Sequence, residues 1–228
     1  MTDKEKNTQN VIAIDGPAGS GKSTISRILA KRIHCLYLDT GAMYRAVALV
    51  ADRTGVGLSN GKELRDLCQE VALRFKTDED PPRLFSGDED ISGAIRSPEM
   101  DMLSSTVSAV KEVREAMVTL QRKMAEGVKL VAEGRDMGTV VFPRAQYKFF
   151  LTASPEIRAQ RRYRERLERG ESISRGLVEE ELRQRDRQDQ TRSLAPLKPA
   201  HDAVVIDSTA LTPEEVIEKI LGYLEEGF

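Results

Sequence analysis

The sequence predicts an α/β protein built on a central parallel five-stranded sheet with helices on both faces. Five short apolar runs recur along the 228 residues, and helical patterns lie between them. Nearly continuous apolar strands that alternate with helices are typical of a parallel sheet covered on both sides. The five runs are Val11–Ile14, Leu36–Leu38, Leu130–Ala132, Phe149–Leu151 and Ala203–Ile206.

The two ends of the chain carry clear local signals. Residues 1–10 are polar, which predicts a mobile tail, and the first apolar run then leads through a glycine-rich turn into a helix with one apolar face. The last helix has a defined start, because Thr212 can cap it, Pro213 takes its first position and two glutamates follow at its positive end. The buried stripe of this last helix is Val216, Ile217, Ile220, Leu221 and Leu224.

Two regions interrupt the alternation of strands and helices. Residues 71–96 contain short alternating segments, a Pro-Pro pair and acidic and glycine turns, which predicts a small antiparallel β meander inserted into the core. Residues 158–192 hold eleven arginines and no lysine against eight acids. This segment therefore carries +3 within a chain of formal net charge −2.

Composition excludes several classes of protein. A chain this close to neutrality is not a general nucleic-acid coat protein. Cys35 and Cys68 fit neither a disulfide framework nor a CxxC metal pattern. The N-terminus lacks the apolar stretch of a secretory signal, and no segment approaches the roughly 20 apolar residues of a membrane span. We therefore expect a cytoplasmic protein with no membrane or nucleic-acid partner.

One motif identifies a phosphate site. Residues 16–23 fit GxxxxGK[ST] directly after a strand and before a helix, so backbone N–H groups and the helix N-terminus can surround a phosphate. In such a P-loop the lysine reaches the β- and γ-phosphates and the serine hydroxyl can bind Mg²⁺. The motif predicts a P-loop NTPase three-layer fold that binds ATP through Gly16, Pro17, Ala18, Gly19, Ser20, Gly21, Lys22, Ser23 and Thr24.

The phosphoryl acceptor is the next question. The sequence has no NKxD motif of a guanine-reading GTPase and is short for a motor domain, which favours a kinase. A nucleoside monophosphate needs no catalytic base, because its phosphate is already largely dianionic at pH 7 with a second pKa of about 6. Such an acceptor needs cations instead, and arginines grip phosphate in bidentate fashion. Four arginines share one helical face, although a solvated face paired with Glu165 and Glu168 is the alternative: Arg158, Arg162, Arg166 and Arg169.

Several segments then resemble the bacterial cytidylate kinases (CMP/dCMP kinases), which are P-loop nucleoside monophosphate kinases. The resemblance extends from about residue 11 to the C-terminus and is most specific in EGRDMGTVVFP. The matching segments are IDGPAGSGKST at 14–24, LDTGAMYRA at 38–46, GDEDISGAIR at 87–96, VREAM at 113–117, EGRDMGTVVFP at 133–143, RDRQDQTRSLAPLKPA at 185–200 and VVIDST at 204–209.

The resemblance implies roles for individual residues. Lys22, Arg135, Arg158, Arg162 and Arg192 are expected to be catalytic, holding the transferred phosphoryl group. Ser23 is expected to bind Mg²⁺. Asp136 is expected to accept from the cytosine amino group and to disfavour uracil, which has a carbonyl there. The acceptor-binding set is Asp39, Thr40, Tyr44, Arg45, Ser105, Arg114, Arg135, Asp136, Arg185, Asp189 and Arg192. Glu133 and Asp207 end apolar runs, and capping or loop hydrogen bonding is favoured over a metal role for both.

The resulting hypothesis is a monomeric kinase that transfers the γ-phosphoryl group of ATP, with Mg²⁺, to CMP or dCMP. We expect one domain at 11–228, with an acceptor-binding region at about 39–117 and a short helical arginine-rich lid at about 157–176. Two alternatives stay open: a kinase for UMP, AMP or a hydroxyl metabolite, and a non-catalytic nucleotide- or RNA-binding P-loop module. An acceptor panel distinguishes them.

Overall fold

The computed structural model describes residues 10–77 and 79–224, so the predicted tail at 1–10 lies outside the described residues except for Asn10. The chain divides into two compact units. Unit 1 is Met1–Leu38 with Gly127–Phe228, and unit 2 is Asp39–Glu126. The predicted single kinase domain and its internal boundaries stay predictions.

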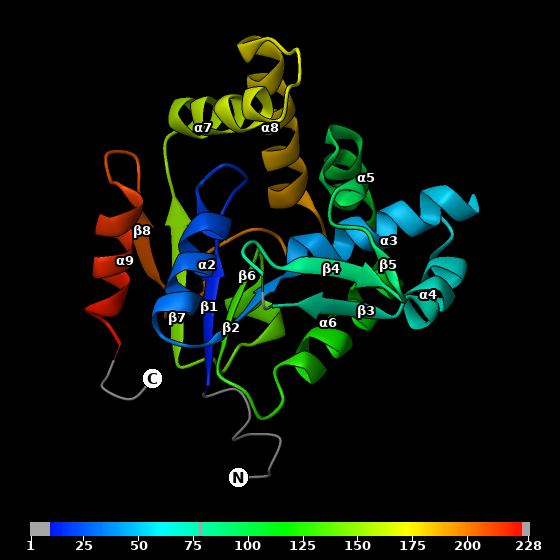
Figure 1. Ribbon diagram of the computed structural model, residues 1–228, viewed down its shortest axis with the longest axis horizontal. Helices are drawn as coiled ribbons and strands as arrows, with labels where there is room; N and C mark the ends of the chain where they lie inside the picture. The colour runs from blue at the N-terminus through cyan, green and yellow to red at the C-terminus, as the bar shows by residue number, and fades with distance from the viewer. Residues whose placement is uncertain (1–9, 78, 225–228) are drawn as a thin grey trace. The chain divides into compact units, whose positions relative to one another are not determined.

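Unit 1 is organised around the predicted five-stranded sheet, whose order is β2-β6-β1-β7-β8. The pairings of β1 with β6, β1 with β7 and β7 with β8 are all parallel. Figure 1 shows β1 in blue beside β7 in yellow-green. All five apolar runs of the sequence are strands: β1 (Val11–Asp15), β2 (Leu36–Asp39), β6 (Leu130–Gly134), β7 (Tyr147–Thr152) and β8 (Val204–Asp207).

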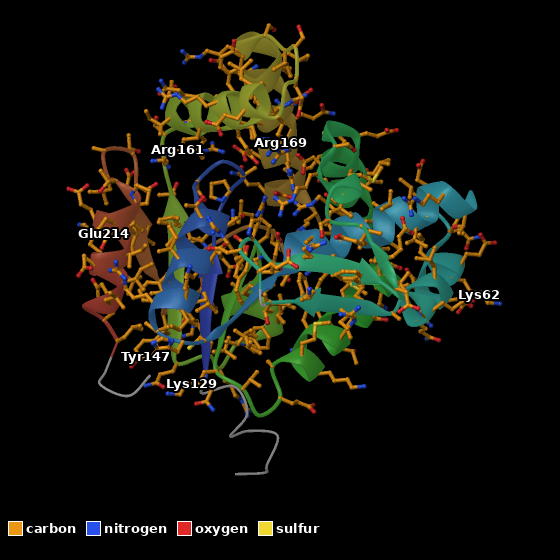
Figure 2. The ribbon with its side chains drawn as sticks, in the orientation of Figure 1. Lys62, Lys129, Tyr147, Arg161, Arg169 and Glu214 are labelled. Carbon is orange, nitrogen blue, oxygen red and sulfur yellow. The ribbon has the colours of Figure 1, made fainter. Side chains whose placement is uncertain are left out.

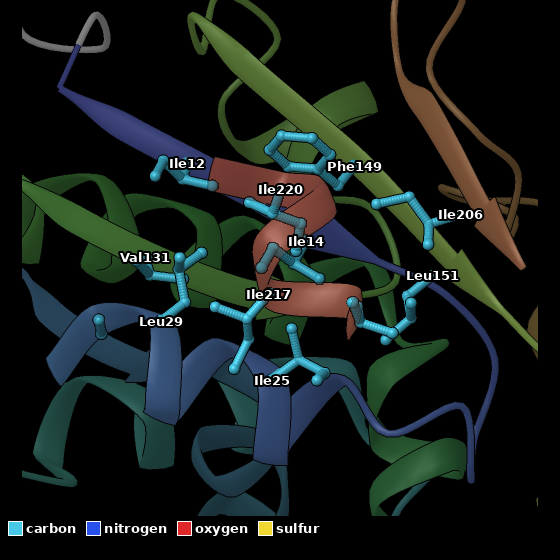
Figure 3. Packing of buried hydrophobic residues seen from close by; sticks show 12 residues of the cluster. Ile12, Ile14, Ile25, Leu29, Val131, Phe149, Leu151, Ile206, Ile217 and Ile220 are labelled. Carbon is cyan, nitrogen blue, oxygen red and sulfur yellow. The ribbon is translucent and has the colours of Figure 1, made fainter. Parts of the chain in front are cut away.

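Two helices cover one face of this sheet. Helix α2 (Lys22–Arg32) contributes Ile25 and Leu29 to an apolar cluster with Ile12 and Ile14 of β1 (Figure 3). Helix α9 (Pro213–Leu221) adds Val216, Ile217 and Ile220 to the same cluster. The predicted cap of α9 is confirmed, since the Thr212 hydroxyl accepts from the Glu215 amide and the Glu215 carboxylate accepts from the Thr212 amide.

The other face of the sheet is covered as well. Val11 and Ala13 alternate with Ile12 and Ile14 along β1, so they point to the opposite side, and all four residues are fully buried. A strand buried on both faces requires an unbroken apolar run, which is the pattern that predicted β1.

The arginine-rich part of unit 1 forms two helices, α7 (Pro155–Glu168) and α8 (Arg175–Thr191). They pack together through Ala159, Val178 and Leu182, with Ala18 of the phosphate loop in the same cluster. A five-residue π-helix, η2 (Met137–Val141), precedes β7. The predicted lid at about 157–176 covers most of α7 and only the start of α8, which continues to Thr191, and its role as a lid stays a prediction.

Unit 2 holds the predicted meander as a three-stranded antiparallel sheet: β3 (Leu73–Lys76), β4 (Arg83–Ser86) and β5 (Glu89–Asp90). Helix α3 packs on α5, and α4 packs on α6. The helices of this unit are α3 (Thr40–Thr54), α4 (Gly61–Glu70), the short η1 (Ala94–Arg96), α5 (Pro98–Ser108) and α6 (Lys111–Met124). Within the part of the chain that the structure describes, no helix is both long enough and apolar enough to cross a membrane.

Candidate active site

The P-loop lies between β1 and α2, as the sequence predicts, and its shape depends on glycine. Gly16 has φ +150°, and a Cβ there would lie 2.0 Å from the Leu151 carbonyl oxygen of β7. Gly19 has φ +74°, and a Cβ there would lie 2.8 Å from the Arg158 carbonyl oxygen of α7. Both contacts are with backbone, which has little room to move. The loop therefore requires glycine at these two positions for steric as well as conformational reasons.

Lys22 begins helix α2 and is buried, with 6% of its surface exposed. Its Nζ donates to the Pro17 carbonyl at 2.8 Å, so the side chain folds back over the loop. Burial, together with the positive charges of Arg135 and Arg185, lowers the pKa of Lys22 to about 7, although nearby carboxylates partly offset this. An anion bound in the loop would restore the charge, because a negative neighbour favours the protonated amine. Ser23 and Thr24 are exposed in the first turn of the helix.

Three of the predicted acceptor-binding arginines lie in unit 1 close to one another. Arg135 follows β6 and donates from Nε to Asp189 Oδ2 at 2.9 Å. Burial raises the pKa of the Asp189 carboxyl, but Arg135, Arg185 and Arg192 outweigh burial and hold that pKa below its usual value. Asp189 is therefore an ionised anchor that orders the arginines around it.

Asp136 is almost fully buried, with 3% of its surface exposed. Its Oδ1 lies 3.7 Å from Nη2 of Arg192, whose Nε donates to the Ala195 carbonyl at 2.6 Å. The backbone that follows Asp136 is held by Asp15, which accepts from the amides of Met137 and Gly138 at 2.8 Å each. The sequence reasoning assigned no role to Asp15, because its partners are more than 120 residues away.

Glu133 is the next-to-last residue of β6 and is buried, with 3% of its surface exposed. Tyr37 of β2 donates its hydroxyl to Glu133 Oε1 at 2.6 Å. The negative charge of Glu133 is also one of the charges that raise the pKa of Lys22, so the two groups lie within electrostatic reach of each other. The other carboxylate noted in the sequence, Asp207, accepts from the amide and hydroxyl of Thr209, which is the loop hydrogen bonding that was expected.

The four arginines that share one face of α7 form hydrogen bonds or ion pairs with carbonyls and carboxylates of the protein. The buried guanidinium of Arg158 donates to the carbonyls of Ala153 and Ala18 at 3.1 Å each and lies 2.7 Å from Asp186 of α8. Glu165 accepts from both Arg162 and Arg169. This pairing belongs to the alternative in which the arginines form a solvated face paired with Glu165 and Glu168. Arg166 is buried between Glu171 and Glu181. A role at the transferred phosphate stays a prediction for Arg158 and Arg162.

Arg161 is a residue that the sequence analysis missed. It lies on α7 outside the four-arginine face and donates to the Ser20 carbonyl of the P-loop at 3.3 Å. It also donates to the hydroxyl and the carbonyl of Ser208, at 2.9 and 2.8 Å. Figure 2 labels Arg161 on the first of the two arginine-rich helices. Its partners are a P-loop residue and the residue that follows β8, both far away in the sequence, so helical spacing alone did not single it out.

Unit 2 brings four predicted residues together at the start of α3. Asp39 caps this helix, because its Oδ1 accepts from the Ala42 amide at 2.8 Å. Arg45 donates to Asp39 Oδ2 at 3.2 Å and lies 3.7 Å from Asp101 of α5. Thr40 and Tyr44, which belong to the same matched segment, are buried. Arg45 is thus oriented by two carboxylates.

The two remaining predicted residues, Ser105 and Arg114, lie in the same unit and are linked through Ser108. Arg114 is buried, lies 5.9 Å from the ring centre of Tyr44 and donates to the Ser108 carbonyl at 3.2 Å. The Ser108 hydroxyl in turn donates to the Ser105 carbonyl at 2.8 Å. The neighbours of Ser105 use their hydroxyls within their own helix, since Ser104 donates to Asp101 and Thr106 to Met102.

Known proteins resemble this chain over nearly its whole length. The family model described as "Cytidylate kinase" matches residues 12–226. The chain belongs to the cytidylate kinase family. The cytidylate kinase of Citrifermentans bemidjiense is 48% identical over 216 residues, which cover 95% of this chain and 93% of that protein. The cytidylate kinase of a Geobacter species is 50% identical over 208 residues, which cover 91% of this chain and 89% of that protein.

Solved structures resemble the chain more distantly. The shikimate kinase from Acinetobacter baumannii matches at 16% identity and a TM-score of 0.47, covering 98% of this chain and 100% of that one.

Proposed function

We propose that this member of the cytidylate kinase family transfers the γ-phosphoryl group of ATP to CMP or dCMP, giving ADP and CDP or dCDP. The observation that carries the proposal is the cation cluster of unit 1. Lys22 of the P-loop lies within electrostatic reach of Arg135 and Arg185, and Asp189 anchors Arg135. A cluster of this kind can neutralise two phosphate groups that must approach each other.

On the donor side, the P-loop amides and Lys22 would hold the β- and γ-phosphates. Lys22 would exchange the Pro17 carbonyl for phosphate oxygens and take up a proton in the process. Mg²⁺ prefers oxygen ligands and phosphate. The exposed Ser23 hydroxyl and the buried Glu133 carboxylate supply oxygens that fit such an ion. When bound, Mg²⁺ would neutralise charge on the β- and γ-oxygens.

On the acceptor side, no side chain is needed as a base. The CMP phosphate is already the nucleophile at pH 7, so catalysis consists of positioning and charge stabilisation. We assign Arg135 and Arg192 to the acceptor phosphate and to the transferred group, and Arg185 and Asp189 to the acceptor near its ribose. Arg158 would act mainly by holding the P-loop through the Ala18 carbonyl, and Arg162 by closing over the phosphates.

Base selection rests on hydrogen-bond direction. The Asp136 carboxylate can accept from the N4 amino group of cytosine, whereas the O4 carbonyl of uracil offers only an acceptor. Ser105 and Arg114 of unit 2 would supply donors to the cytosine O2 and N3. Arg45, oriented by Asp39 and Asp101, would bind the acceptor phosphate, with Thr40 and Tyr44 supporting that segment.

An acceptor panel tests the proposal. ADP formation from ATP is measured with CMP, dCMP, UMP and AMP as acceptors, and with no acceptor. We expect the highest kcat/KM with CMP or dCMP and little ATP hydrolysis alone. Turnover of UMP or AMP at least as good as that of CMP would show a different acceptor, and ATP binding with no acceptor-dependent turnover would show a binding module. Asp136→Ala should weaken CMP use and narrow the gap between CMP and UMP.

The oligomeric state and the location of the protein also belong to this proposal. We propose that the kinase works as a monomer in the cytoplasm and that ATP and CMP or dCMP are its substrates. Gel filtration with light scattering measures the first directly, and a mass near 25.4 kDa is expected.

A further inference from the structure

Asp15 occupies an unusual position between the donor and acceptor machinery of unit 1. It is the last residue of β1 and immediately precedes Gly16 of the P-loop. In the parallel register of the sheet it lies opposite Gly134 of β6, which leads into Arg135 and Asp136. Its side chain is buried, with 4% of its surface exposed, and the proposed reaction does not use it.

The carboxylate of Asp15 makes two hydrogen bonds to the segment that carries Asp136. Oδ1 accepts from the Met137 amide and Oδ2 accepts from the Gly138 amide, each at 2.8 Å. Hydrogen bonds to an ionised acceptor are short and about twice as strong as neutral ones. Both oxygens are therefore committed to the two residues directly after Asp136.

The segment also has a backbone geometry that needs such support. Residues 137–141 form a π-helix, in which the Phe142 amide donates to the Met137 carbonyl at 2.7 Å. Single π-helical turns are rare and occur frequently at functional sites. On its other side Gly138 lies against Lys148, because a Cβ at Gly138 would approach Lys148 Cδ to 3.2 Å. The start of this helix is thus fixed between Asp15 and Lys148.

We propose that Asp15 is a positioning residue for acceptor selection: by holding the amides of Met137 and Gly138 it sets where the Asp136 carboxylate lies, and so it determines how well the kinase distinguishes cytosine from uracil. The inference rests on the proposed function, in which Asp136 reads the base. A purely structural cap would make the same two hydrogen bonds. The two roles differ in what a substitution changes, because a cap affects stability alone, whereas a positioning residue affects acceptor use selectively.

The test compares Asp15→Asn and Asp15→Ala with the unchanged kinase. Asn keeps one acceptor oxygen and turns a donor toward the other amide, whereas Ala loses both bonds. We expect Asp15→Asn to raise the KM for CMP on the order of 10-fold and to lower the preference for CMP over UMP by a similar factor. Asp15→Ala should go further in the same direction, while the KM for ATP stays within about 2-fold for both variants, as expected if the P-loop is not disturbed.

Amide hydrogen exchange supplies a readout independent of turnover. The amides of Met137 and Gly138 should exchange slowly in the unchanged protein and faster in Asp15→Asn, with Gly138 the more affected if Asn keeps its oxygen toward Met137. Val216→Ala is the matched control for lost stability, because it removes buried volume where α9 packs in the apolar cluster with α2. It should lower the melting temperature without changing the preference for CMP over UMP.

Three results would overturn the proposal. Asp15 variants that lose stability but keep the KM for CMP and the CMP preference would make Asp15 a structural cap. A KM for ATP that rises as much as that for CMP would place its effect in the P-loop. Unchanged amide exchange at Met137 and Gly138 would show that Asp15 does not hold the segment that carries Asp136. If the Asp15 variants fail to fold, Gly138→Ala shifts the same segment from the Lys148 side and must show the same loss of CMP preference. An unchanged kinase with no CMP preference would instead refute the proposed function.

Discussion

Lys22→Met should make the protein more stable while removing its activity. The lysine is buried in a cluster with Arg135 and Arg185, and its pKa falls from 10.5 to about 7. In the unfolded chain the same amine holds its proton up to about pH 10.5. One pKa unit corresponds to about 1.4 kcal/mol, so at pH 7 the buried amine costs the folded state about 4 kcal/mol. Methionine has a similar length and no charge.

The net gain is smaller than this cost, because the variant also loses the hydrogen bond from Nζ to the Pro17 carbonyl, which contributes about 1 kcal/mol. We therefore expect a gain of about 3 kcal/mol at pH 7. For a chain of this size each kcal/mol shifts the melting temperature by about 2 to 4 °C. Turnover should fall on the order of 100-fold or more, because the main cation of the P-loop is gone.

The effect of Lys22 on the free energy of unfolding depends on pH. Between pH 7 and 10.5 the unfolded state binds more protons at this site than the folded state, so the stability of the unchanged protein rises with pH. The cost of the buried lysine falls to about 2 kcal/mol at pH 9, and the advantage of Lys22→Met must shrink accordingly. Urea unfolding at pH 7 and pH 9 measures both values.

Lys31→Met is the matched control, because Lys31 is exposed on the same helix. It should change stability by less than about 0.5 kcal/mol at either pH and leave turnover intact. The reasoning would be refuted if Lys22→Met were less stable than the unchanged protein at pH 7. A gain of equal size at pH 7 and pH 9 would also refute it, since the charge of Lys22 would then have no part in the effect.

Three other substitutions test separate parts of the structure. Gln121 is fully buried in α6, and neither of its amide atoms has a hydrogen-bond partner among the described residues. Gln121→Met should therefore raise the free energy of unfolding, measured in urea, by about 1 to 3 kcal/mol. A decrease would point to a bridging water. Gly16→Ala should raise the KM for ATP at least 10-fold, because its Cβ would collide with the Leu151 carbonyl. Gly55→Ala is the control, since Gly55 has φ +72° and open space around it. It should lower the free energy of unfolding by about 1 kcal/mol and leave the KM for ATP unchanged. Tyr37→Phe removes the hydroxyl that donates to Glu133 and should raise the Mg²⁺ concentration for half-maximal activity several-fold; an unchanged Mg²⁺ requirement would make the contact purely structural.

Features encoded locally could be predicted from the sequence. The five apolar runs became the five strands because a strand buried on both faces leaves a continuous apolar signature. The meander at 71–96 was marked by its turns, and the start of α9 by Thr212 and Glu215. The P-loop was predicted because its glycines, Lys22 and the surrounding strand and helix are contiguous in the sequence.

Features that depend on distant partners could not be predicted. The hydrogen bonds of Asp15 arise only because β1 lies beside β6, and nothing in residues 137–141 marks a π-helix. The arginines of α7 shared a helical face, but whether each meets phosphate, a carboxylate or a carbonyl depends on how α8 packs against α7. Arg158 pairs with Asp186 for that reason. The roles of the acceptor-binding residues rest on the family resemblance and stay predictions for experiment.

The position of β8 at the end of the sheet order has a consequence for aggregation. A strand at a sheet edge offers unpaired backbone groups to any other extended chain, and Val205 of β8 is 57% exposed. The strand is only four residues long and ends at Asp207, whose carboxylate binds Thr209. Short length and a terminal charge are two devices that discourage the addition of a foreign strand. Removing the charge of Asp207 would therefore make this edge a better template for self-association, even if catalysis were unaffected.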